Sequence, residues 1–234
     1  TTIASFIKSE FGIQLSELDF QDVIEKILAV DENMVGRIAG NLPNYVLNFM
    51  IRQAFSTTRK DQNLAHVEIG VLFGGSLMLT QMALQTTGSP QPNVGSDPFD
   101  GYYKNTTGRK NDLILDIPID QETVIKNFES FGLSKNNLRL IKGYSNSDQV
   151  KNECQYQIGT LFIDGDHSFE GVKRDWEHYS KLVVKDGYVI VDNYNDSSWP
   201  EVTEYINNEV LAKDPSWTTR IVLNKTIVLR RSPD

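Results

Sequence analysis

Two stretches of the sequence, FIDGDH at residues 162–167 and IVDNY at residues 190–194, each join an apolar run to a cluster of polar side chains. Short apolar runs of this kind are typical of strands buried in a parallel sheet. The segment between them is long enough for one helix and its turns, as a strand-helix-strand unit requires. Because parallel strands end at the same edge of a doubly wound sheet, we expect both clusters to face one crevice.

The same alternation extends in both directions along the chain. Apolar runs at residues 66–70, 93–97, 138–143, 160–164 and 188–192 alternate with helical segments at residues 76–87, 121–131, 146–153 and 169–184. After a further helix near Pro200, the runs 218–223 and 226–229 are joined only by Asn224-Lys225, so they must pair as an antiparallel hairpin. We predict an α/β fold with a doubly wound, mostly parallel, seven-stranded Rossmann-like sheet that ends in an antiparallel hairpin.

Residues 1–60 show helical periodicity and form a predicted extension that precedes a main domain at residues 61–234. Pro43 fits the first turn of its second helix. We expect this extension and the segment 101–118, which contains Tyr102-Tyr103 and Gly108-Arg109, to form a lid over the crevice. Two apolar stripes should face the core: Leu18, Val23, Ile27 and Leu28 on one, and Val46, Leu47, Met50, Ile51 and Phe55 on the other.

A similar stripe is expected within the helical segment 169–184, where Trp176, Tyr179, Leu182 and Val183 should pack against the sheet. The neighbouring charges of Lys173-Arg174-Asp175 are expected to be solvated. This segment is therefore interpreted as a structural helix.

The composition limits the classes of partner. The chain has 234 residues, with 23 Lys and Arg against 31 Asp and Glu, and a formal net charge of −8. This balance is unsuited to phosphate backbones or anionic lipids, so we expect a small-molecule partner and neither nucleic acid nor a membrane. The single cysteine, Cys154, excludes an intramolecular disulfide and favours a cytoplasmic location. The sequence leaves open whether the chain forms a homo-oligomer or is part of a larger biosynthetic chain.

Glycines follow the first run of the alternating pattern, in the stretch EIGVLFGGS at residues 68–76. Gly70 and Gly74 allow a tight turn and the close approach of a ligand, and N–H groups at a helix start near Ser76 favour a carboxylate or phosphate. The order GxGxxG of a dinucleotide site is missing, and a tight turn without a ligand is the alternative. Asp97 ends the next run, where an acid accepts hydrogen bonds from ribose hydroxyls or simply closes the strand before Pro98.

Asp164, Asp192 and Asn193 bring three oxygen-bearing side chains to neighbouring strand ends. Such a set suits a hard cation, Mg²⁺ or alternatively Mn²⁺, and a cation would relieve the repulsion between two facing carboxylates. The alternative is that both acids cap helices or accept from backbone amides. His167 and Asp166 are rival candidates for a general base.

These stretches resemble the class I methyltransferases related to macrocin O-methyltransferase, in which a parallel sheet also ends in an antiparallel hairpin. The similarity covers residues 65–210 and is carried by residues 68–77, 97–103, 163–172, 185–187 and 191–194. The resemblance implies that Asp164, Asp192 and Asn193 bind the metal and that Asp166 or His167 is the base. The pair Asp192-Asn193 departs from the two acids of macrocin-type enzymes and matches catechol-type O-methyltransferases. The implied cofactor is S-adenosyl-L-methionine, with Glu68 and Gly70 near its methionine end and Asp97 at its ribose. The residues expected to contact this cofactor are Glu68, Gly70, Gly74, Ser76, Asp97, Tyr144, Ser145 and Asp164.

The resulting hypothesis is an S-adenosylmethionine-dependent O-methyltransferase that uses a divalent metal to methylate a hydroxyl group of a sugar, phenol or polyketide natural product. Two alternatives remain at this stage. One is an NAD-type oxidoreductase on a similar sheet, and the other is a catalytically silent methyltransferase-like module that binds a partner protein.

Overall fold

The computed structural model describes residues 2–101 and 110–233. Strands in these residues form one seven-stranded sheet in the order β3-β2-β1-β4-β5-β7-β6. Their bounds are β1 Ala65–Ile69, β2 Asn93–Asp97, β3 Leu138–Lys142, β4 Ile158–Ile163, β5 Val183–Val191, β6 Trp217–Leu223 and β7 Thr226–Arg231. The first five strands pair in parallel, whereas β7 is antiparallel to both β5 and β6. The predicted fold class, including the terminal hairpin, is confirmed.

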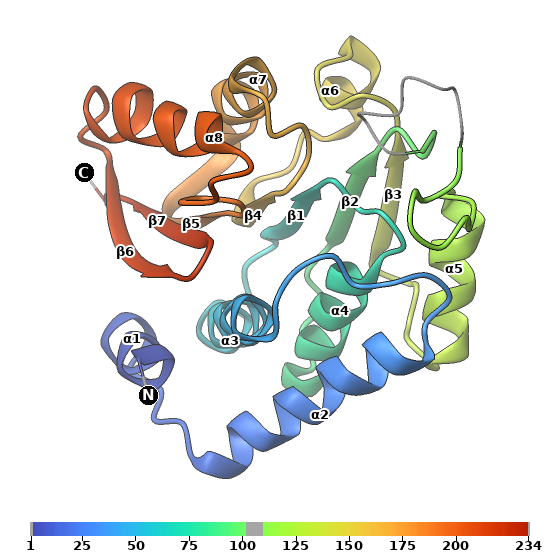
Figure 1. The fold of residues 1–234 in the computed structure, drawn as a ribbon. Coiled ribbons are helices and arrows are strands. Elements are labelled where there is room, and N and C mark those ends of the chain that lie inside the picture. Colours follow the sequence, from blue (N-terminus) through green and yellow to red (C-terminus); the bar gives the residue numbers. More distant parts are fainter. Residues whose placement is uncertain (1, 102–109, 234) are drawn as a thin grey trace.

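Helices cover both faces of the sheet (Figure 1). One face carries α3 (Leu42–Thr58) and α4 (Gly75–Thr87), with α2 (Glu17–Asn33) outside them and α1 (Thr2–Phe11) near the hairpin. The other carries α6 (Asp148–Glu153), α7 (Phe169–Tyr179) with the 3₁₀ turn Ser180–Leu182, and α8 (Pro200–Tyr205), which continues as the π-helical turn Ile206–Leu211. Beyond the edge strand β3 lies α5 (Gln121–Ser130). Among the described residues, five begin a helix with a side chain that accepts a hydrogen bond from a first-turn N–H group: Ser16, Asn41, Asp120, Ser147 and Ser168.

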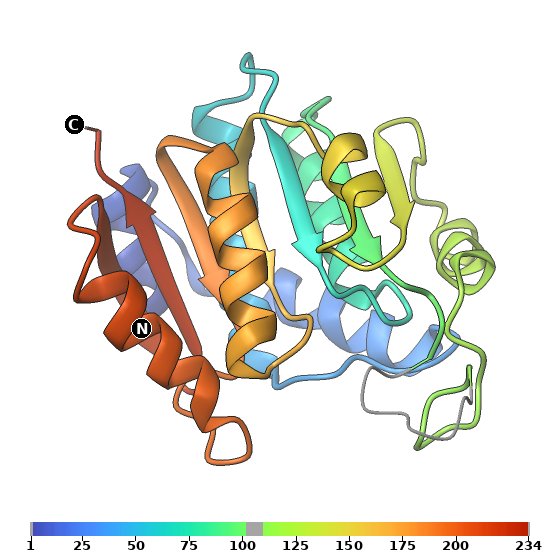
Figure 2. The ribbon, with the colours of Figure 1, turned by 90° about the horizontal axis from the view of Figure 1, so that it is seen from above.

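The parallel strands all end at one edge of the sheet, as Figure 2 shows. The segment that joins α2 to α3 crosses this edge and brings Arg37, Gly40 and Asn41 to it. Asn41 then begins α3, and Pro43 lies in the first turn as predicted. The N-terminal part of the chain therefore lines the same cavity as the strand ends.

The N-terminal helices share a hydrophobic core with the sheet. Phe6, Ile27 and Phe55 pack in one cluster with Phe162 and Tyr188. The predicted α3 stripe is buried throughout, so that expectation is confirmed. The division into an extension and a domain at residue 60 stays a prediction.

The predicted stripe of α2 is half wrong. Val23 and Ile27 are buried, but Leu18 is 75% exposed and Leu28 is 44% exposed. The buried face instead follows the spacing of Val23, Ile27 and Val30. Leu28 lies one position, about 100°, around the helix from Ile27, and this rotation turns it away from the core.

An ion network docks α1 onto the hairpin. The Glu10 side chain is 2% exposed. It accepts hydrogen bonds from the Tyr188 hydroxyl at 3.1 Å, from Arg220 Nε at 2.9 Å and from Arg230 Nη1 at 3.4 Å. Charge-assisted bonds of this kind are stronger than neutral ones. Strands β5, β6 and β7 are thus tied to the first helix.

The expected lid is only partly visible. Tyr102-Tyr103 and Gly108-Arg109 lie outside the described residues. Within the described part, Asn111 forms an isolated antiparallel bridge with Pro118, and Arg37 donates to Asp112 with its Nη2 at 2.8 Å. The lid function stays a prediction. In residues 2–101 and 110–233, no helix is long and apolar enough to cross a bilayer.

The chain leaves β1 at Gly70, directly beside the end of β4. Gly70 has φ +90°, and a Cβ atom there would lie 2.1 Å from the carbonyl oxygen of Asp164. The Asp164 N–H group donates to the Ile69 carbonyl at 2.9 Å, so the two strand ends are held together. Only glycine meets both the positive φ and this approach.

We expect Gly70→Ala to cost more stability than a glycine substitution without a clash. Gly132 is the matched control, because it has φ +62° and no atom within 4 Å of an added Cβ. Gly132→Ala should cost the backbone strain alone, about 1–2 kcal/mol, and Gly70→Ala should cost that plus the backbone clash. Urea unfolding of the two variants measures the difference, and equal losses would contradict the close approach.

Candidate functional site

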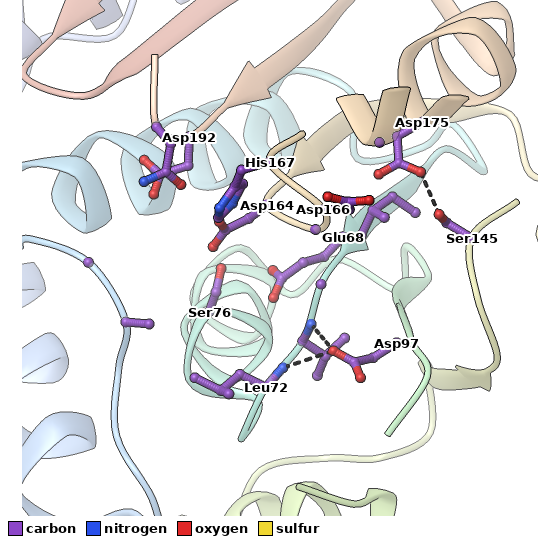
Figure 3. A pocket seen from close by; sticks show the side chains of 18 of the residues that line it. Glu68, Leu72, Ser76, Asp97, Ser145, Asp164, Asp166, His167, Asp175 and Asp192 are labelled. Atoms are coloured by element: carbon purple, nitrogen blue, oxygen red, sulfur yellow. Dashed lines mark hydrogen bonds and ion pairs between the residues drawn. The ribbon is translucent and has the colours of Figure 1, made fainter. Parts of the chain in front are cut away.

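A cavity of about 960 Å³ opens at the carboxyl ends of the strands (Figure 3). The predicted site residues that line it are Glu68, Gly70, Ser76, Asp97, Tyr144, Ser145, Asp164, Asp166, His167, Asp192 and Asn193. Gly74 does not line it. This residue precedes α4 with φ +84°, and an added Cβ would lie 2.7 Å from Val124 Cγ1. Every predicted site residue except Gly74 is therefore brought to one cavity, and a contact of Gly74 with a cofactor stays a prediction.

Asp97 holds the glycine turn through its carboxylate (Figure 3). Its Oδ2 accepts from the N–H groups of Val71 at 2.8 Å and Leu72 at 3.2 Å, and its Oδ1 accepts from Phe99 N–H at 2.6 Å. Leu72 and Phe99 both have positive φ, at 53° and 50°. Such conformations are uncommon for these residue types and persist where surrounding contacts enforce them. Asp97 thus closes the strand, as one of the two sequence interpretations states, and also borders the cavity.

Glu68 is a buried acid that lines the cavity beside Ser76 (Figure 3). Burial raises its pKa to about 7, although Arg52 and the Ser76 hydroxyl oppose the shift. Arg52 Nη1 lies 3.5 Å from Glu68 Oε2. The charge of Glu68 therefore depends on Arg52 of α3 and on Ser76 of α4.

Asp164 and Asp192 end the neighbouring strands β4 and β5 at the same side of the cavity (Figure 3). Burial, and then the charge of Asp164, raise the pKa of Asp192 to about 7. Its Oδ1 accepts from Thr226 Oγ1 at 2.7 Å and from Asn44 Nδ2 at 3.3 Å, which fixes the carboxylate. The effect of Asp164 on the pKa of Asp192 is consistent with the prediction that these two carboxylates face each other.

Asn193 follows Asp192 with φ 58°, and its Nδ2 donates to Asp196 Oδ2 at 3.4 Å. Asp164, Asp192 and Asn193 thus offer two carboxylates and one amide oxygen, a donor set that fits a hard cation. Among the residues that the structure describes, no group of three or more His, Cys, Asp and Glu side chains is arranged to hold a metal. An ion here would therefore be bound by this mixed set together with substrate oxygens or water.

The sequence reasoning missed several lining residues, among them Asp196, Trp199 and Lys225. Lys225 Nζ lies 2.7 Å from Asp196 Oδ2, and this bond holds the pKa of Asp196 at about 2. Lys225 belongs to the hairpin turn and Asp196 to the loop after β5. Their pairing depends on the return of β7 beside β5, so no local pattern marks it.

The two candidate bases differ in their surroundings. His167 Nε2 lies 3.1 Å from Asp164 Oδ1, and its ring is 5.0 Å from that of Trp199. Asp166 instead accepts from Ser168 N–H at 3.0 Å and lies 3.6 Å from Arg174 Nη2. His167 is thus next to the acids at the strand ends, whereas Asp166 is engaged at the start of α7.

Asp175 corrects the expectation of a solvated charge on α7. It is 2% exposed, and its Oδ1 accepts from Ser145 Oγ at 2.5 Å (Figure 3). Burial raises its pKa to about 7, against the effect of this hydrogen bond. The sequence held the signal, because Val172, Asp175 and Tyr179 have the spacing of one helix face. Trp176, Tyr179 and Val183 are buried as predicted, and Leu182 is partly buried.

The sheet order, the closing hairpin and a cavity that joins a glycine turn to acidic strand ends define the class I methyltransferase fold. A model of the methyltransferase-domain family matches residues 67–194. Uncharacterized protein R132 of Acanthamoeba polyphaga mimivirus is 30% identical over 190 residues, which cover 80% of this chain and 74% of that protein. The chain belongs to the methyltransferase-domain family.

Solved structures show the same fold. The O-methyltransferase NovP has a TM-score of 0.60 at 17% identity and covers 91% of this chain and 79% of its own. CalS11, a TDP-rhamnose 3′-O-methyltransferase of calicheamicin biosynthesis, has a TM-score of 0.57 at 19% identity, with coverage of 93% and 96%. TomG of Streptomyces achromogenes, solved with S-adenosylmethionine, has a TM-score of 0.58 at 12% identity, with coverage of 100% and 97%.

We expect Asp175→Asn to gain stability relative to the wild type as pH rises. The wild-type carboxyl stays protonated in the folded state up to a pKa of about 7, whereas the unfolded state loses the proton near pH 4. Folding stability therefore falls between these values, and the amide removes this loss. The advantage of the variant should grow by on the order of 2–3 kcal/mol between pH 5 and pH 8 in denaturant unfolding.

The control for this measurement is Asp31→Asn, which replaces an exposed acid. Its stability difference from the wild type should hardly change with pH. A pH-independent difference for Asp175→Asn would contradict a buried, protonated carboxyl group.

Proposed function

We propose that this protein transfers the methyl group of S-adenosylmethionine to a hydroxyl group of a small molecule, with a divalent metal at Asp164, Asp192 and Asn193. The observation that carries the proposal is the single cavity in which the glycine turn of β1 and the acids of β4 and β5 meet. The glycine turn suits a nucleoside cofactor, and the acids at the strand ends suit an oxygen acceptor. Their proximity is what a direct transfer between two bound molecules requires.

The cofactor in this proposal lies over the ends of β1 and β2. Gly70 allows its close approach, and Glu68 and Ser76 face its methionine end. Asp97 already accepts three backbone N–H groups, and the remaining lone pairs of its carboxylate would accept from the ribose hydroxyls. The adenine would extend toward Tyr144 and Ser145, which line the cavity after β3.

The reaction forms a bond between the acceptor oxygen and the methyl carbon while the bond from that carbon to sulfur breaks. S-adenosylhomocysteine leaves, and the hydroxyl proton moves to a base. His167 is the better placed base, because Asp164 Oδ1 at 3.1 Å stabilises the imidazolium that forms. A bound divalent ion supplies Lewis acidity that lowers the pKa of the acceptor hydroxyl.

The charges of the lining favour a neutral acceptor, such as a diol, over an anionic one. Among the described lining residues, each Lys and Arg side chain is paired with an acid: Arg37 with Asp112, Arg174 with Asp166 and Lys225 with Asp196. Among the described residues, Asp164 and Asp192 have no Lys or Arg partner, and Asp164 contacts only the imidazole of His167 as a possible cation. The sugar acceptor in the name of CalS11 is one example of a hydroxyl compound of this kind.

The free, buried Cys154 is compatible with a reducing cytoplasm.

Asp192→Ala should lower methyl transfer by about 100-fold or more while S-adenosylhomocysteine still binds. Transfer is measured with methyl-labelled S-adenosylmethionine on a panel of catechols, sugars and polyketide alcohols, and binding by calorimetry. EDTA should abolish wild-type transfer, and added Mg²⁺ should restore it. The exposed acid of Asp31→Ala serves as the control, and wild-type transfer that resists EDTA would refute the metal.

His167→Gln should reduce transfer by about 10²–10⁴-fold, as the loss of a general base does. Asp166→Asn should cause the smaller loss, because Asp166 contacts Ser168 and Arg174 and not the acids at the strand ends. Rates for both variants at saturating cofactor decide between them. The reverse order would make Asp166 the base.

A further inference from the structure

One face of α3 carries a row of buried polar side chains beneath the cavity. Asn44, Asn48, Arg52 and Ser56 are spaced by four residues, one helical turn, and all four are buried. A helix packed on a sheet normally buries apolar side chains on that face. The upper end of this row meets the site, because Asn44 Nδ2 donates to Asp192 Oδ1 at 3.3 Å.

Arg52 is the member of the row that costs the most to bury. Its side chain is 2% exposed, and its guanidinium lies 5.6 Å from the centre of the Phe162 ring. Its Nη1 contacts the Thr80 hydroxyl, and within the described residues its Nε and Nη2 have no hydrogen-bond partner. A buried cation held this incompletely is destabilising unless a nearby anion compensates it.

That anion is Glu68. Arg52 Nη1 lies 3.5 Å from Glu68 Oε2, and both side chains are 2% exposed. Among the described residues, Oε2 has no hydrogen-bond partner, so this charge interaction is what holds it. The Ser76 hydroxyl on α4 also bonds Glu68, and the carboxylate of Asp164, directly after β4, repels it.

We infer that Arg52 is a positioning residue for the cofactor: through Glu68 it keeps an anion directed at the ammonium group of S-adenosylmethionine. The inference rests on the proposed function, which puts the methionine end of the cofactor at Glu68. Arg52 itself does not line the cavity. The effect of replacing Arg52 on affinity should therefore depend on the charge of the ligand. It should disappear in a variant in which Glu68 is replaced by a neutral residue.

Two ligands separate this role from a general effect on folding. S-adenosylhomocysteine carries the ammonium group, whereas 5′-methylthioadenosine has the same nucleoside and lacks the amino-acid end. Calorimetry on the full chain should show that Arg52→Met weakens S-adenosylhomocysteine by about 10-fold to 100-fold, the range for a lost charged contact. The affinity for 5′-methylthioadenosine should change by less than about threefold.

Further variants keep the test decisive if Arg52→Met does not fold. Arg52→Lys restores a cation and should recover most of the preference for S-adenosylhomocysteine. The double variant Arg52→Met with Glu68→Gln removes both buried charges, which proteins tolerate better than the loss of one. The affinity of the double variant for S-adenosylhomocysteine should equal that of Glu68→Gln alone. Ser56→Ala, one turn along the same helix face, is the control for packing, and it should leave the ratio of the two affinities unchanged.

Three results would overturn the inference. Unchanged affinities in Arg52→Met, or an equal loss for both ligands, would make the role of Arg52 structural. A further loss in the double variant beyond that of Glu68→Gln would show that Arg52 acts without Glu68. A wild-type chain that binds neither ligand would instead refute the cofactor assignment, and the inference would fall with it.

Discussion

The contact between the backbone at Gly70 and the carbonyl oxygen of Asp164 is the constraint on which the site depends. It joins the end of β1 to the end of β4 with no side chain between them. The Asp164 N–H bond to the Ile69 carbonyl and the Gly70 N–H bond to the Ser96 carbonyl extend this link across β1, β2 and β4. The glycine turn and an acidic strand end are thereby held at a separation set by the sheet. Preorganisation of this kind removes the entropy cost of bringing two reactants together.

The cavity concentrates acids in a buried setting, and this has consequences for how it can treat a cationic cofactor. Glu68, Asp175 and Asp192 each have a pKa raised to about 7, with burial as the leading cause. An anion next to the sulfonium would stabilise the reactant more than the transition state, because the positive charge of the sulfur is lost during transfer. An anion next to the ammonium group has no such effect, since that charge does not change. Affinity can then come from Glu68 without slowing the chemical step.

Sequence patterns predicted the parts of the site that belong to the sheet. Asp97, Asp164 and Asp192 each end an apolar run, and the topology of a doubly wound sheet brings such ends together. Lys225 and Asp196 could not be found this way, because they meet only after β7 returns beside β5. Leu28 is exposed because the other helices cover a different face of α2, and the spacing of apolar residues in α2 does not show which face is covered.

Asp175 was missed for a different reason. Its helical spacing predicts a place on the buried face of α7, whereas its charge favours a prediction of exposure. The general lesson is that an acid on an apolar stripe of a helix is itself a sign of a site.

Some of the residues that set the charges of the site lie outside the segment that carries the family pattern. That segment, residues 67–194, contains Glu68 and Asp192. The partners of these acids come from either side of it, since Arg52 and Asn44 belong to α3 and Thr226 to β7. The ion network of Glu10 with Arg220 and Arg230 in turn fixes α1 against the hairpin that contains Thr226. Because flanking elements contribute to the ionisation and orientation of these acids, a substitution in α3 or β7 can change the charge of the site without altering the strand ends themselves.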